Sequence, residues 1–123
     1  MTNVEVVLKF YEEVFNNKDL SNLDDLMLDS YMQHNPTAPD GKEGFKKFLE
    51  FFFTLDPHMD IIKILENSEN EVAVFFKCTC RANGSINKVV DIYRLENGKL
   101  AEHWDVVEHD VKEFSETNGR SIF

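Results

Sequence analysis

The segment Val89–Val107, "VVDIYRLENGKLAEHWDVV", contains two runs of largely alternating apolar and polar residues on either side of Asn97-Gly98. Both turn residues tolerate positive φ, and an Asn-Gly pair between two such runs is a strong signal for a β-hairpin. The segment therefore predicts two antiparallel strands, Ser85–Leu95 and Lys99–Glu108.

Two further strands are expected just before this hairpin. After Pro57 the apolar residues recur with period two, which predicts strands over His58–Glu66 and Glu71–Arg81. A second Asn-Gly pair, Asn83-Gly84, marks the turn that follows. Strands joined by such short turns predict an antiparallel meander.

The first third of the chain has helical periodicity instead. Thr2 and Glu5 have the spacing of a capping box, which predicts a helix start. The apolar stripe of that helix comprises Val4, Val7, Leu8, Tyr11, Val14 and Phe15. A short helix over 19–28 is expected next, followed by an extended piece, Tyr31–His34, because Pro36 disfavours helix just before it.

A third helix is expected over Lys42–Leu55. Its inward residues would be Phe45, Phe48, Leu49 and Phe52. Phe51 and Phe53 point elsewhere, so this helix is apolar nearly all round, as a cavity lid, a subunit contact or a core helix would be. Core packing is the simplest of the three explanations.

Helices followed by a meander in one chain of this length predict a single α+β domain, residues 1–123. Three helices on one face of a strongly curved antiparallel sheet would form a cone with an open end. Such a pocket is the default place for a small-molecule ligand.

Composition argues against several classes of partner. The net charge of −10 disfavours nucleic acid and anionic membrane surfaces. No apolar run approaches the roughly 20 residues of a membrane span, and the first residues lack a signal-peptide core, so a cytoplasmic location is expected. Cys78 and Cys80 share a strand face with poor geometry for a disulfide, which predicts two buried, reduced residues.

The hairpin register decides which side chains share a face, and two registers are open. A two-residue turn places Asp91 opposite Trp104, with Asp105 on the other face. A three-residue loop, Glu96-Asn97-Gly98, places Asp91 opposite His103.

The three-residue loop sorts the residues better and is the register we expect. Its polar face gathers Val89, Asp91, Tyr93, Ala101, His103, Asp105 and Val107. Its other face gathers Val90, Ile92, Arg94, Leu100, Glu102, Trp104 and Val106. The first set suits a ligand cavity, and the second suits a subunit interface.

The polar face has the groups that acid/base chemistry needs. Asp105 is the candidate acid/base, because an aspartate in an apolar cone can exchange a proton with a substrate. His34 and His103 are candidates to hold an oxyanion or a water, Asp91 to orient His103, and Tyr93 to add a donor. Met32 is expected to share the direction of His34, since the two are two residues apart on an extended segment.

Structural alternatives stand beside these roles. His34 could cap the loop at Pro36, and Asp91 could form an ion pair with Lys77 or Lys88. A metal site built from His34, Asp91, His103 and Asp105 has suitable ligand types, but no sequence spacing supports it. No metal site is therefore predicted.

The segments "YMQHNPTAPDG", "VVDIYRLENGKLAEHWDVV" and "SETNGRSIF" resemble the SnoaL-like proteins of the nuclear transport factor 2-like superfamily. The resemblance covers nearly the whole chain. It implies a cone-shaped α+β barrel, dimeric through its sheet, with a deep pocket. It also implies cofactor-free aldol chemistry by one aspartate, as in polyketide cyclases.

The family is also similar in layout to limonene epoxide hydrolases and ketosteroid isomerases. By that resemblance Asp105 matches a pocket aspartate and His34 a water-holding asparagine. Lys77 and Thr79 match an arginine and a second aspartate, so the hydrolase set is incomplete. In the subfamily pattern a histidine is common at the position of Phe75.

Two functions follow as expectations. The first is a cofactor-free enzyme of the aldol, cyclase or isomerase type, with catalytic Asp105, His34, His103 and Asp91. Its ligand would contact Met32, Tyr93, Phe75, Lys77 and Phe52. The alternative is a binding protein for small hydrophobic ligands without catalysis. We also expect a homodimer through the apolar sheet face, and a tail whose Phe123 packs on the cone or on the partner subunit.

Overall fold

The computed structural model describes residues 1–123. Its elements, in chain order, are α1 (Asn3–Phe10), the π-helix η1 (Tyr11–Asn16), α2 (Leu23–Leu26), β1 (Met27–Gln33), α3 (Gly41–Phe52), the 3₁₀ turn η2 (Phe53–Leu55), β2 (Pro57–Glu66), β3 (Glu71–Cys80), β4 (Ser85–Glu96) and β5 (Lys99–Glu108). The four strands of the predicted meander are confirmed to within a residue at each end. The expected capping box at Thr2 is also confirmed.

The strands form one five-stranded sheet in the order β1-β5-β4-β3-β2. The strands from β2 to β5 pair antiparallel, whereas β1 pairs parallel to β5. The predicted α+β class is confirmed, but the sheet is mixed where only an antiparallel one was expected. The difference arises because the short extended piece expected at Tyr31–His34 begins at Met27 and satisfies the otherwise free hydrogen-bonding edge of β5.

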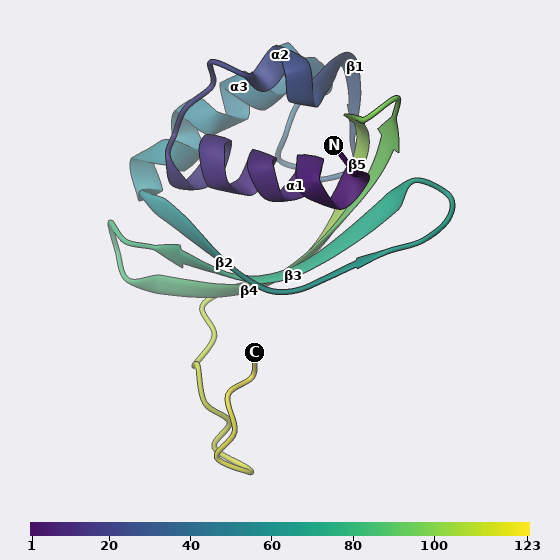
Figure 1. The fold of residues 1–123 in the computed structure, drawn as a ribbon. Helices are drawn as coiled ribbons and strands as arrows, with labels where there is room; N and C mark the ends of the chain where they lie inside the picture. Colours follow the sequence, from purple (N-terminus) through teal and green to yellow (C-terminus); the bar gives the residue numbers. More distant parts are fainter.

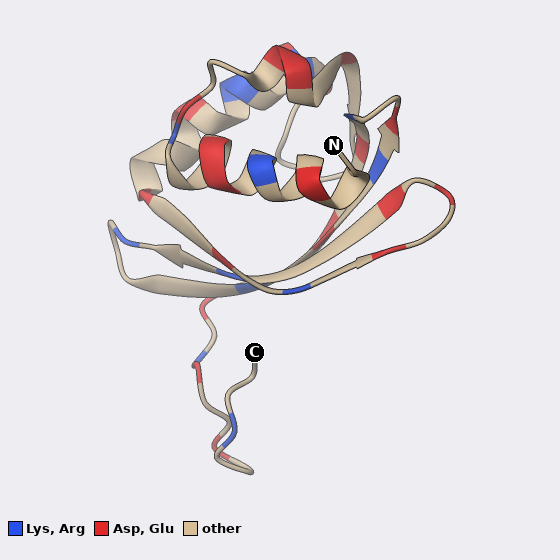
Figure 2. Ribbon diagram, in the orientation of Figure 1, with Lys and Arg blue, Asp and Glu red and all other residues tan.

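Figure 1 shows the helices packed over the concave face of the curved sheet, with the C-terminal tail leaving from the opposite side. A core of 22 buried residues lies between the two layers. Lys42 ties α3 to the preceding elements, because its Nζ lies 2.6 Å from a carboxylate oxygen of both Asp24 and Asp29. Other charged residues lie on the outer side of α1 (Figure 2). None of the helices has the length and apolar character of a membrane span.

The β4–β5 hairpin differs from the expected three-residue loop. Asn97 and Gly98 have φ values of 49° and 75°, as a two-residue type I′ turn requires. Leu95 then pairs with Leu100 and Arg94 with Glu102, which leaves an extra residue, Ala101, as a β-bulge.

The bulge corrects the expected register. Asp91 lies opposite Asp105, and the predicted pairing of Asp91 with His103 is wrong. Because one extra residue reverses the alternation, Asp91, His103 and Asp105 still share the concave face. Leu100, expected on the outer face, is fully buried in the core instead.

Candidate active site

A cavity of about 310 Å³ lies between the helices and the concave face of the sheet. Its apolar wall includes Phe15, Phe45, Phe48, Phe52, Met59 and Phe76. Such a volume and such a lining are typical of a small-molecule site.

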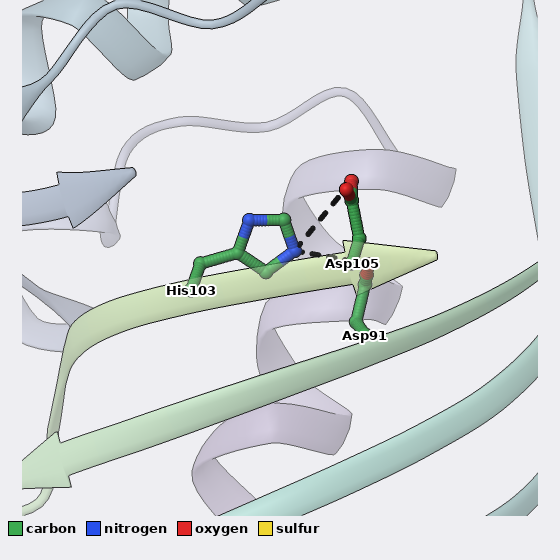
Figure 3. Close-up of side chains that lie close together, drawn as sticks. All are labelled: Asp91, His103 and Asp105. Atoms are coloured by element: carbon green, nitrogen blue, oxygen red, sulfur yellow. Dashed lines mark hydrogen bonds and ion pairs between the residues drawn. The ribbon is translucent and has the colours of Figure 1, made fainter. Parts of the chain in front are cut away.

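Asp91, His103 and Asp105 form a polar cluster in this cavity (Figure 3). The Nε2 atom of His103 lies 2.9 Å from Asp91 Oδ1 and 4.0 Å from Asp105 Oδ2. Asp91 comes from β4 and the other two residues from β5, so the hairpin itself assembles the cluster. The predicted grouping of these three residues on one face is confirmed.

Asp91 is held by two tyrosines. Tyr11 and Tyr93 both donate to Asp91 Oδ2, the latter over 3.1 Å, and the two phenol oxygens lie 2.9 Å apart. Burial, and then the negative charge of Asp91, raises the pKa of each phenol well above its usual value. Both tyrosines therefore remain neutral donors, and both oxygens of the buried Asp91 side chain have hydrogen-bond partners.

Asp105 has a different environment. Its Oδ2 accepts a 2.6 Å hydrogen bond from Asn35 Nδ2, and its side chain is 13% exposed. The Asn35 amide is oriented by Thr37, whose backbone N–H and hydroxyl both donate to Asn35 Oδ1. Asp105 therefore keeps an open side toward the cavity, where a substrate proton could be taken.

Sequence reasoning missed Gln33 and Asn35, which both line the cavity. Gln33 lies opposite His103 in the β1–β5 ladder, and its Oε1 is 2.5 Å from His103 Nδ1. The available signal was Tyr31: with this aromatic residue inward, alternation also places Gln33 and Asn35 inward.

His34 and Met32 point away from the cavity, so the expected meeting of His34 with Asp105 is wrong. His34 stacks on Trp104 with 4.8 Å between ring centroids, and its Nε2 lies 2.7 Å from Glu102 Oε2. Met32 is 44% exposed. The alternation of this segment was recognised correctly, but its phase was reversed, because the inward positions of β1 are set by contact with the core.

Phe75 and Lys77 also lie on the outer face of the sheet, contrary to their expected place at the ligand. Phe75 stacks on Phe123, and Lys77 forms a 2.9 Å ion pair with Glu113. In β3 every second residue is buried, and the inward set is Val72, Val74, Phe76, Cys78 and Cys80. The alternative ion pair between Asp91 and Lys77 is therefore wrong, and so is a position for Thr79 in the cavity.

The two remaining residues that were predicted to contact the ligand do lie at the cavity. Tyr93 and Phe52 line the cavity, as do the two free, buried cysteines. Burial and the neighbouring Cys80 raise the pKa of Cys78 to about 12, which makes this thiol a poor nucleophile.

The cluster could also offer ligands to a metal, since one ligand atom from each of Asp91, His103 and Asp105 lies within 4.8 Å of the others. His34, the fourth residue considered for such a site, lies on the other face of the sheet. Both ring nitrogens of His103 already have protein partners, Gln33 and Asp91. A metal ion would have to replace the contact between His103 and Asp91.

Comparison with known proteins agrees with this architecture. The chain is similar to a SnoaL-like polyketide cyclase from Agrobacterium tumefaciens, with 19% identity, a TM-score of 0.71, and coverage of 88% of this chain and 92% of the other. It is also similar to IdmH from Streptomyces antibioticus, with 19% identity, a TM-score of 0.73, and coverage of 88% and 93%. Bal32a, from a soil-derived mobile gene cassette, is similar as well, with 16% identity, a TM-score of 0.75, and coverage of 85% of this chain and 88% of the other.

At these identities the solved structures establish a common fold. No curated protein sequence matches the chain. The sequence pattern of the SnoaL-like polyketide cyclases matches residues 5–110, which comprise most of the chain. The chain therefore belongs to the SnoaL-like polyketide cyclase family.

Proposed function

We propose that this chain is a cofactor-free enzyme that uses Asp105 as an acid/base in aldol, cyclase or isomerase chemistry on a small carbonyl compound. The observation that carries the proposal is the open carboxylate of Asp105, held by Asn35 at the polar end of an apolar cavity. A carboxylate that faces an apolar cavity in this way is suited to general acid/base catalysis.

The proposed reaction begins when Asp105 takes a proton from the carbon next to a carbonyl group, which gives an enolate. Asn35 Nδ2 bonds Asp105 through one proton, and its second proton is a candidate donor to the enolate oxygen. In an aldol closure the enolate carbon attacks a second carbonyl of the same molecule. Asp105 then returns the proton to the new alkoxide; in an isomerisation it returns the proton to a different carbon.

The lining also limits the charge of the substrate. Asp91, Asp105 and Asp110 line the cavity, and no lysine or arginine does. An anionic substrate would be repelled by these carboxylates and would find no lysine or arginine as a counter-ion. We therefore propose a carbonyl compound without negative charge.

The alternative is a non-catalytic binding protein for small hydrophobic ligands. The six aromatic and thioether side chains of the apolar wall favour this alternative, because they provide a binding surface without any chemistry. The absence of a salt bridge between Lys77 and Asp105 supports the enzyme, since such a bridge would block the carboxylate.

The two functions differ in whether a carbon-bound proton is removed. We would measure deuterium exchange next to the carbonyl of 2-tetralone, an uncharged bicyclic ketone, by proton NMR. If the chain is an enzyme, Asp105→Asn should reduce the protein-dependent exchange rate by about 10²–10⁴-fold, which is the typical contribution of a positioned acid/base. Asp25→Asn, at an exposed position of α2, is the matched control. Binding of the ketone with equal exchange in both variants would support the binding protein instead.

We further propose that the chain functions as a homodimer through the outer sheet face. Val90, Ile92 and Val106 are exposed there, with fractions of 36%, 39% and 74%. An apolar surface of this kind favours association with a second copy.

The cytoplasmic location expected from the sequence remains a prediction.

A further inference from the structure

The bonds of the Gln33 side chain determine where the protons of the polar cluster lie. The backbone N–H of Asn35 donates to Gln33 Oε1 over 3.1 Å, which identifies this atom as the amide oxygen and fixes the orientation of the amide. The same oxygen lies 2.5 Å from His103 Nδ1. An amide oxygen only accepts hydrogen bonds, so Nδ1 must carry a proton.

The other ring nitrogen faces a carboxylate. His103 Nε2 lies 2.9 Å from Asp91 Oδ1, and one of these two atoms must supply a proton. Asp91 already accepts hydrogen bonds from Tyr11 and Tyr93, and each such bond favours its ionised form. The proton therefore belongs on Nε2, and His103 is an imidazolium.

The surroundings of His103 support this charge. The ring of Tyr93 stacks on the imidazole with 4.9 Å between centroids, at a distance where an aromatic face attracts a cation. The ring of Tyr31 is nearly parallel to the imidazole, with 6.4 Å between the ring centroids. The titratable groups that face His103 are Tyr31 of β1, Tyr93 and Asp91 of β4, and Asp105 of its own strand; none of them is a cation.

We infer that Gln33 is a positioning residue that keeps His103 protonated on both ring nitrogens. His103 then neutralises Asp91, and Asp105 is left as the free carboxylate of the cluster. The role of Asp105 as the base rests on the proposed function, whereas the protonation of His103 does not. The inference distinguishes the two aspartates and excludes His103 itself as a base.

The test is nitrogen-15 NMR of the histidine rings at pH 7, which reads the protonation of each ring nitrogen without any substrate. The His103 signals are those missing from the spectrum of His103→Asn. We expect both His103 nitrogens to be protonated in the unchanged protein. A neutral His103 ring, with a single protonated nitrogen, would overturn the inference whether or not the Gln33 variants fold.

Three substitutions test the part played by Gln33. Gln33→Met keeps the length of the side chain without an acceptor, and should convert His103 to the form protonated at Nε2 alone. Gln33→Glu restores an acceptor and should retain both protons. Met32→Leu, on the opposite face of β1, is the control and should leave the spectrum unchanged. Retention of both protons in a folded Gln33→Met would overturn the role of Gln33. Absence of deuterium exchange with 2-tetralone would count against the proposed function alone.

Discussion

Asp91 and Asp105 lie directly opposite each other on β4 and β5, with the imidazole of His103 close to both. Like charges at opposed positions of a β-ladder repel each other, so the histidine between them compensates an arrangement that would otherwise be unfavourable. The cluster is therefore coupled, and the removal of one member changes the environment of the others.

This coupling can be measured with a double-mutant cycle. Asp91→Asn and His103→Gln should each destabilise the protein, because each leaves a buried partner without its counterpart. The double variant should recover about 0.5–3 kcal/mol relative to the sum, measured by urea unfolding. Strict additivity of the two free-energy changes would contradict the contact between the side chains.

The buried position of Leu100 predicts a large effect on stability. Leu100→Ala should reduce the free energy of unfolding by about 2–5 kcal/mol, as is typical for truncation of a buried leucine. Leu65→Ala, at a residue that is 68% exposed, should change it by about 0.5 kcal/mol or less. Similar effects at both positions would place Leu100 outside the core.

The proposed dimer can be tested by sedimentation at micromolar concentration. Trp104→Glu would place a charge on the outer sheet face, beside Ile92, and should shift the protein from dimer to monomer. Phe51→Glu changes an exposed aromatic residue on α3 and should leave the dimer intact. A monomer in the unchanged protein would refute the assembly through the sheet.

The tail provides another test. Phe123 stacks on Phe75 at 6.2 Å between ring centroids, and Lys77 Nζ lies 5.8 Å from the centroid of the Phe123 ring. Removal of residues 119–123 should therefore lower the melting temperature, by about 4 °C for each kcal/mol lost. Phe114→Ala, at a tail residue that is 61% exposed, is the control. An unchanged melting temperature after the deletion would show that these contacts do not stabilise the fold.

Stability should fall in acid partly through Glu102. Hydrogen bonds from His34 and then Arg94 lower the pKa of Glu102 below its ordinary value of 4.5. A lowered pKa in the folded protein gives stability that is present above pH 4.5 and is lost as the pH falls through the folded value. Glu102→Gln should therefore reduce the loss of melting temperature between pH 6 and pH 3. An identical acid-induced loss in both proteins would contradict this contribution.

Local pattern was sufficient for the four strands of the meander and for the start of the first helix, but it placed residues 27 and 28, which belong to β1, in a helix. Alternation and the two Asn-Gly pairs located β2 to β5, and the Thr2–Glu5 spacing located the start of α1. These features depend on residues close together in the chain, whose preferred conformations survive folding because the tertiary structure agrees with them. The same patterns placed Asp91, His103 and Asp105 on one face.

The details of the site depend on contacts between distant segments. The bulge at Ala101 and the parallel pairing of β1 with β5 determine that Asp91 lies opposite Asp105 and that Gln33 and Asn35 point inward. Alternation leaves the choice between the two faces of a strand open, and burial against the helices makes that choice. The sequence alone therefore determined the class of fold and the residues of the β4–β5 cluster. Only the packing of β1 and the helices on the sheet decided which side chains meet Asp105 and His103. A one-residue shift in the alternation of a strand changes no local conformational preference, so the burial of apolar residues in the core determines which face points inward.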